Sequence, residues 1–136
     1  DLKIIGWSYG LNMTSQLVID AFIKAENTRK IEEGMIFHSD LGSQYTSNEY
    51  EQLLLKKSVK HSYSKKGYPY DNASMESFNA ILKKEEVNVN TYATFKEAKL
   101  AIFEFIESWY NNTRIHGSLK YKTPNQKYNE YIKNIA

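Results

Sequence analysis

Strand-like runs alternate with helical patterns along the first half of the chain, and this order limits the possible folds more than any other feature. Residues 2–9 alternate large and smaller side chains, residues 35–38 form a short apolar run, and residues 59–63 alternate again. Helical spacing of apolar residues follows Thr14 and then Ser47, both of which are plausible helix caps. Strands separated by helices predict an α/β fold with a mixed central sheet flanked by helices. We expect the run at 35–38 to be a central strand buried on both faces.

The second half of the chain is dominated by helical patterns. Asp71 or Asn72 is a plausible cap for a helix that reaches about Glu86. A longer pattern begins at Thr94, and its apolar residues step by three and four positions over residues 95–110, which predicts a helix buried on a wide face. A proline at position 124 then starts a short final helix, because proline is tolerated in a first turn.

Composition narrows the class of protein without naming a function. A length of 136 residues predicts one domain. The net charge of +2 does not by itself indicate a nucleic-acid-binding protein, so any such property must come from clustered charges. The absence of cysteine excludes disulfides and thiolate zinc sites and is typical of a reducing cytosol. No secretion signal or membrane-length apolar run is present, so we expect a cytoplasmic protein without a membrane partner.

Two acidic residues carry the most chemical information. Asp40 directly follows the predicted strand at 35–38, Glu76 lies in the first turns of the predicted helix after Asp71, and 35 residues separate the two. Carboxylates on such supports suit Mg²⁺ or Mn²⁺, which prefer oxygen ligands on a rigid frame. Two ions held in this way can clamp the attacking and leaving oxygens of a phosphodiester. Each residue alone also has an ordinary interpretation, as a turn aspartate or as an exposed glutamate favoured by the helix dipole.

Three motifs in order resemble one family. His38–Tyr45 has the pattern HSDxGxQY, Asp71–Phe78 has the pattern DNAxxESF, and Tyr110–Leu119 is followed by Thr-Pro. Together they resemble the catalytic core of insertion-sequence transposases of the OrfB type, which group with retroviral integrases in the DDE superfamily. The resemblance covers about Ile4 to Tyr128. It implies an RNase H-like fold in which Asp40 and Glu76 are catalytic residues and ligands of Mg²⁺ or Mn²⁺.

The chain departs from that family at its beginning. The family has three carboxylates, and the first stands on a strand that precedes the segment resembling residues 1–9. We therefore expect residues 1–136 to be a single, truncated integrase-like core that lacks the first strand and the first catalytic aspartate. Asp20 falls within a helical pattern and is interpreted as a surface charge rather than as the missing ligand.

The resemblance also implies a reaction and partners. Family members cut DNA at the end of a mobile element and transfer the freed 3′-hydroxyl to target DNA, so we expect a metal-dependent polynucleotidyl transferase of bacterial origin. We expect the DNA of the element ends and of the target as partners, and a homo-oligomer in the active complex. We expect little or no activity from this chain alone. Two alternatives remain open: an RNase H-fold nuclease that does not join DNA, and a non-catalytic DNA-binding or assembly remnant.

Basic and amide side chains near the two carboxylates are candidate DNA contacts. Some lie in a loop that interleaves basic and aromatic residues, others share the helical face of Glu76, and one belongs to the C-terminal motif. Lysine contacts of this kind bind phosphates without reading sequence. The predicted DNA-binding residues are Lys65, Lys66, Asn72, Asn79, Lys83 and Arg114. The loop residues could instead be an ordinary solvated surface.

The sequence leaves two possible roles open for His38, and two for Arg114 and His116. His38 is either a packed strand residue or a residue that lines the site with Asp40. Arg114 and His116 either contact DNA or tie the last helices to the core. The run His38-Ser39-Asp40 contains the residue types of a hydrolase relay, but neighbours on one strand cannot form it, so we exclude that interpretation.

Overall fold

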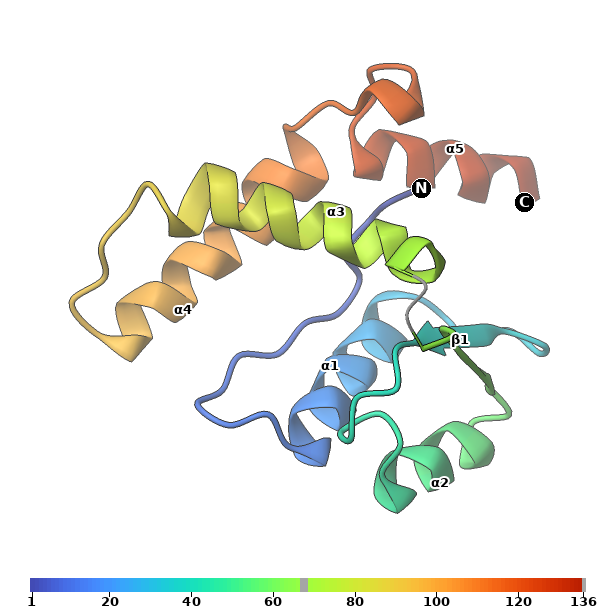
Figure 1. Ribbon diagram of the computed structural model, residues 1–136. Helices are drawn as coiled ribbons and strands as arrows, with labels where there is room; N and C mark the ends of the chain where they lie inside the picture. The colour runs from blue at the N-terminus through green and yellow to red at the C-terminus, as the bar shows by residue number, and fades with distance from the viewer. Residues whose placement is uncertain (67–68, 136) are drawn as a thin grey trace. The chain divides into compact units, whose positions relative to one another are not determined.

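A computed structural model describes residues 1–66 and 69–135 of the chain (Figure 1). Within that part, short helices and two strands alternate before residue 64, and only helices follow it. The α-helices and strands are α1 (Ser15–Thr28), β1 (Ile36–Ser39), α2 (Asn48–Lys56), β2 (Lys60–Tyr63), α3 (Ala73–Leu82), α4 (Phe95–Glu104) and α5 (Pro124–Ile135). The 3₁₀ and π-helical segments are η1 (Pro69–Asn72), η2 (Lys83–Val87), η3 (Phe105–Tyr110) and η4 (Gly117–Leu119).

The chain divides into two compact units. Ile5–Met75 form one unit, and Asp1–Ile4 together with Glu76–Ala136 form the other. We call Ile5–Met75 the first unit and the other the second unit. The expectation of a single domain stays a prediction. No described helix is long and apolar enough to span a bilayer.

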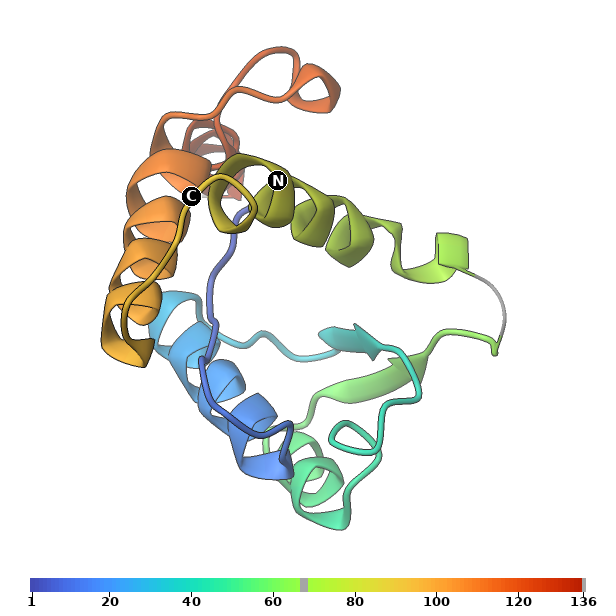
Figure 2. The same ribbon diagram turned by 60° about the vertical axis from the view of Figure 1, so that its left-hand side comes forward.

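The sheet lies in the first unit and has two described strands. β1 pairs with β2 in parallel, with Phe37 opposite His61 and Ser39 opposite Tyr63. In Figures 1 and 2, α1 and α2 lie on the same side of these strands. The opposite side carries Ile36, which is 63% exposed. The prediction of a strand buried on both faces is therefore wrong, because the side chains of β1 meet packed helices on one face only.

The core of this unit is formed largely by α1 and α2, and both helices begin at the predicted caps. The Thr14 hydroxyl accepts the amide of Leu17, and the Ser47 hydroxyl accepts the amide of Tyr50, which confirms both caps. Capping groups of this kind satisfy amides that have no partner inside the helix. The buried residues of this core are Val18, Phe22, Tyr50, Leu54 and Val59.

The predicted strand at residues 2–9 is wrong, since the structure has no strand there. An alternating pattern forms a strand only where another strand supplies hydrogen bonds. Gly6 instead packs so closely on α1 that an added Cβ would lie 2.3 Å from the carbonyl oxygen of Ala21. Lys24 of α1 donates to the carbonyl of Trp7 at 3.1 Å.

A side-chain amide binds the start of the chain in the second unit. The Asn111 side chain accepts from the amide of Ile4 and donates to its carbonyl, both at 2.9 Å. This pair of bonds satisfies the two backbone groups as a neighbouring strand would. Asn111 is only 2% exposed, so its own polar atoms depend on Ile4.

The remaining helices of the second unit follow the sequence prediction with one change. α5 begins at Pro124 as expected, and Phe78 of α3 packs edge-to-face on Tyr110 at 5.1 Å between ring centroids. The predicted wide buried face after Thr94 is narrower than expected, because Phe103 and Trp109 are exposed. The π-helical turns of η3 add a residue per turn, which shifts the side chains relative to a regular α-helix.

Candidate functional site

Asp40 lies directly after β1, in a tight loop that leads to α2. Its Oδ1 accepts the amide of Gly42 at 2.8 Å, and no described residue bonds its other carboxylate oxygen. The side chain is exposed. A fixed, accessible carboxylate with spare oxygen lone pairs is a suitable ligand for a hard divalent ion.

The loop has little room for change. An added Cβ at Gly42 would lie 2.9 Å from Oδ1 of Asp40 and 2.7 Å from the Gln44 side chain. The amides of Tyr45 and Thr46 both donate to the carbonyl of Gly42. Both contacts are with the ends of flexible side chains, so a larger residue at this position would have to displace the carboxylate of Asp40 or the amide of Gln44.

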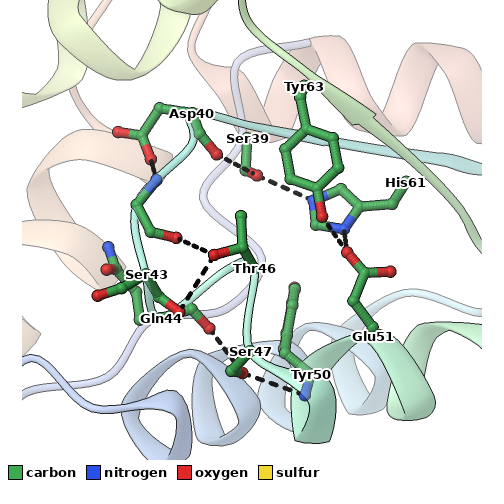
Figure 3. Close-up of polar contacts among 11 residues, drawn as sticks. Ser39, Asp40, Ser43, Gln44, Thr46, Ser47, Tyr50, Glu51, His61 and Tyr63 are labelled. Carbon is green, nitrogen blue, oxygen red and sulfur yellow. Dashed lines mark hydrogen bonds and ion pairs between the residues drawn. The ribbon is translucent and has the colours of Figure 1, made fainter.

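A relay of side chains from α2 and β2 reaches the residue before Asp40, as Figure 3 shows. Nδ1 of His61 lies 2.7 Å from Oε1 of Glu51, and its Nε2 lies 2.9 Å from Oγ of Ser39. The Ser39 hydroxyl donates to the carbonyl of Asp40 at 2.9 Å. Tyr63 donates its hydroxyl to the same oxygen of Glu51. Sequence reasoning missed this relay, and only the alternation of residues 59–63 hinted that His61 and Tyr63 share a face.

The relay contains the residue types of a hydrolase triad but lacks the access that a nucleophile needs. Ser39 is 4% exposed, and its hydroxyl hydrogen is already used by the carbonyl of Asp40. The exclusion of a hydrolase, made above for three neighbouring residues, therefore also holds for Glu51, His61 and Ser39.

Hydrogen bonding and burial shift three ionisable groups near the loop. The hydroxyl of Tyr63 holds the pKa of Glu51 below its usual value, and His61 adds to this effect. Burial, followed by the bond to Glu51, raises the pKa of Tyr63 to about 12. Burial, followed by the charge of Asp40, raises the pKa of Tyr45. Glu51 is thus held ionised and both phenols neutral at ordinary pH.

Glu76 lies on an open face of α3. Glu76, Asn79 and Lys83 follow one another at helical spacing, and all three are exposed. Phe78 is buried on the opposite side of the helix, where its ring packs on Tyr110 of the same unit. No described residue forms a hydrogen bond or ion pair with the Glu76 carboxylate, so its oxygens are free to bind an ion or to face a polar ligand.

The two carboxylates belong to different units, so their approach to each other stays a prediction. Among residues 1–66 and 69–135, no group of three or more acidic or histidine side chains is placed to hold a metal. The donor types nevertheless fit, since Mg²⁺ and Mn²⁺ prefer carboxylate oxygens and retain water as further ligands.

The DNA contacts beside these residues stay predictions. Lys65 and Lys66 have exposed side chains, and the backbone amide of Lys65 donates to Asp71 at 3.1 Å. Residues 67 and 68 of the same loop lie outside the described part. Asn72 ends η1 and is half-buried.

Arg114 has a partner inside the protein. Its guanidinium forms a bidentate pair with Glu85 at 2.8–3.0 Å, and Trp109 donates its indole N–H to Glu85 at 3.2 Å. Hydrogen bonds from Arg114, then from Trp109, lower the pKa of Glu85. Of the two alternatives for Arg114, this geometry favours a tie between η2 and the C-terminal motif. A DNA contact by Arg114 stays a prediction.

The other two histidines differ in burial. His116 lies beside Arg114 and Tyr110 and is buried, and burial is the main cause that lowers its pKa. Both ring nitrogens of His38 lie 3.0 Å from serine hydroxyls, one on Ser62 and one on Ser64. Because the side chain of His38 is exposed on the same face of β1 as Ile36, both interpretations of His38 stay predictions.

Comparison with known proteins gives the class of this α/β core. A cryo-EM structure of the simian T-cell lymphotropic virus intasome in complex with PP2A regulatory subunit B56γ matches with a TM-score of 0.65 and 18% identity, over 86% of this chain and 41% of the matched chain. The RNase H-like fold class expected from the sequence is thereby confirmed. The described sheet is small, with two parallel strands.

Sequence relatives then give the family. Two integrase core domain models match, one over residues 2–69 and the other over residues 57–124. The chain belongs to the integrase core domain family, and the expected resemblance to insertion-sequence transposases is confirmed. It is 45% identical over 129 residues to the transposase for insertion sequence element IS904 of Lactococcus lactis, covering 93% of this chain and 51% of that protein. It is 37% identical over 133 residues to transposase InsF for insertion sequence IS3A of Escherichia coli, covering 98% of this chain and 45% of that protein. The chain thus spans about half the length of these relatives.

Proposed function

We propose that this chain is the catalytic core of a transposase, and that the complete protein cuts and joins DNA strands during transposition. The observation that carries the proposal is the pair of exposed carboxylates, Asp40 and Glu76, each of which lies within a segment matched by an integrase core domain model. We further propose that DNA of the element end and of the target is the substrate, and that the active complex is a homo-oligomer in the bacterial cytoplasm.

We propose Mg²⁺ or Mn²⁺ as the cofactor, held by Asp40 and Glu76. Divalent ions in such sites activate the attacking oxygen and neutralise charge on the leaving oxygen. The part of the protein itself is to hold the two carboxylates in place. Gly42 orients the carboxylate of Asp40 through its amide, and α3 presents Glu76 beside Asn79 and Lys83.

The exposed basic side chains would position the DNA backbone. Lys65, Lys66 and Lys83 have no described salt bridge that would compete with a phosphate. Each lysine that contacts a phosphate releases a counterion, so binding should weaken steeply with salt and depend little on sequence. Asn72 and Asn79 could add hydrogen bonds to the same backbone. Arg114 contributes chiefly through its tie to Glu85.

The test uses a full-length protein that includes these 136 residues. Glu76→Gln and Asp40→Asn should each abolish cleavage of a duplex that mimics an element end, with DNA binding in a mobility-shift assay retained. Glu104→Gln, which removes an exposed carboxylate from α4, is the matched control and should remain active. Cleavage by Glu76→Gln would refute the proposed role of this residue.

Product analysis separates the proposal from its alternatives. A transposase yields joined strands, whereas a nuclease yields cut strands only, and a non-catalytic binder yields neither and needs no divalent ion. The family resemblance implies a third carboxylate in addition to Asp40 and Glu76. We therefore propose that residues 1–136 alone give little or no joining, and robust joining by this chain would contradict that.

A further inference from the structure

We infer that His61 is a positioning residue for Asp40, acting through Ser39 and anchored by Glu51. This inference rests on the proposed function, because it takes Asp40 as a metal ligand. Its starting point is the relay of Figure 3, in which three elements meet at the end of β1.

The hydrogen bonds of Ser39 show what His61 contributes. A serine hydroxyl has one hydrogen, and Ser39 gives it to the carbonyl of Asp40 at 2.9 Å. The contact of 2.9 Å between Ser39 Oγ and His61 Nε2 links the same hydroxyl group to the imidazole, with the direction set by the tautomer of the ring. His61 thus fixes the rotation of the Ser39 hydroxyl, and the hydroxyl in turn fixes the peptide that follows Asp40.

Glu51 and the surrounding rings fix His61 itself. Nδ1 lies 2.7 Å from the Glu51 carboxylate, which also accepts the hydroxyl of Tyr63. The imidazole packs on Phe37 at 5.5 Å and on Tyr63 at 4.0 Å between ring centroids. Two hydrogen-bonding contacts and the neighbouring aromatic rings together hold the imidazole in place.

The loop that follows Asp40 is also bonded to the start of α2. The Ser47 hydroxyl donates to the carbonyl of Gln44 at 3.0 Å and caps α2, the helix that bears Glu51. Asp40 is consequently restrained twice: its carbonyl through the relay from β2, and its carboxylate through the amide of Gly42. Groups that hydrogen-bond a metal ligand typically change metal affinity or activity 10- to 100-fold when they are removed. Here Ser39 bonds the backbone of Asp40, and His61 acts one bond further out through Ser39.

Two substitutions break the relay with little change of shape. His61→Phe keeps a ring among the same aromatic neighbours but removes both nitrogens, and Ser39→Ala removes only a hydroxyl. Ser62→Ala is the matched control, since Ser62 is also a serine bonded to a histidine ring in this sheet but has no contact with the relay. Thermal unfolding of each variant monitors general loss of structure.

The first readout needs no metal and no activity. Hydrogen–deuterium exchange of the peptide that spans residues 40–46 reports the bond from the Gly42 amide to Asp40. In the full-length protein, His61→Phe and Ser39→Ala should each speed this exchange, because a loop that has lost a restraint opens more often. Ser62→Ala should leave the exchange unchanged. Unchanged exchange in both relay variants would overturn the inference.

The second readout separates positioning from stability. The Mn²⁺ concentration for half-maximal cleavage should rise about tenfold in each relay variant, with the maximal rate recovered at saturating Mn²⁺. The double variant should resemble either single variant, because both break the same chain of bonds. A loss of activity that follows the melting temperature and is not rescued by Mn²⁺ would overturn the inference.

Asp40→Asn distinguishes this inference from the proposed function. If Asp40→Asn is inactive while both relay variants keep the normal Mn²⁺ requirement, the proposed function holds and the positioning role is refuted. If Asp40→Asn still cleaves DNA, the proposed function has failed, and the inference fails with it.

Discussion

Replacing Asn111 should destabilise the protein more than any other exchange of one amide side chain in the second unit. Asn111→Ala removes two hydrogen bonds of 2.9 Å and leaves the amide and the carbonyl of Ile4 without a partner. A buried polar group left unpaired costs about 1–3 kcal/mol. Ile4 is half-buried, so each group falls at the lower end of that range, and we expect a loss of about 2 kcal/mol in the free energy of unfolding.

Asn111→Asp separates hydrogen bonding from side-chain size. The new carboxylate still accepts from the amide of Ile4, but its second oxygen faces the carbonyl that the amide nitrogen had bonded. Burial and this repulsion favour the protonated acid, so the folded pKa of the new carboxyl should lie above its unfolded value near 4. The protonated form can donate to Ile4. The stability of this variant relative to the wild type should therefore be best at acid pH and fall as pH rises through that pKa.

Urea unfolding of the 136-residue chain, followed by circular dichroism at several pH values, measures both effects. Asn129→Ala is the matched control, since Asn129 is exposed on α5 and bonds no described residue. Its free energy of unfolding should stay within about 0.5 kcal/mol of the wild type. The reasoning is refuted if Asn111→Ala is equally neutral, because the two bonds to Ile4 would then contribute nothing to stability.

Three further predictions follow from other contacts. Gly6→Ala should cost about 1–3 kcal/mol in urea unfolding because the new methyl overlaps α1, whereas Gly117→Ala, which meets nothing within 4 Å, should be tolerated much better. Arg114→Ala removes the bonds that lower the pKa of Glu85, a contribution to stability that is present above the unfolded pKa and lost as pH falls; an acid titration of stability should therefore be less steep in this variant. Tyr63, with its pKa raised to about 12, favours folding below pH 10 and loses this effect as pH rises to 12, so alkaline unfolding should be weaker in Tyr63→Phe. An unchanged alkaline transition in that variant would contradict the assigned cause.

Local chemistry allowed several elements to be predicted from the sequence. Thr14 and Ser47 cap helices because their hydroxyls satisfy amides a few residues away, and proline at position 124 starts a helix for an equally local reason. The motif around Asp40 also predicted a tight loop after a strand, and the Gly42 contact provides its physical basis.

Features that depend on distant partners could not be predicted in this way. Residues 2–9 have the alternation of a strand, but the backbone of Ile4 bonds a side chain 107 positions away. The relay joins Glu51, His61 and Ser39 from three elements, and each residue alone resembles an ordinary helix or strand residue. For the same reason the sequence left two roles open for Arg114 until Glu85 was seen beside it.

The bond between Asn111 and Ile4 joins residues that lie 107 positions apart in the sequence but belong to one folded unit. Residues 1–4 belong to the same unit as residues 76–136, so the backbone of Ile4 gains its amide partner only after more than a hundred further residues have been synthesised. A version of the chain without residues 1–4 would lose nothing from the unit Ile5–Met75. It would leave a buried carboxamide unmatched near the other end of the polypeptide.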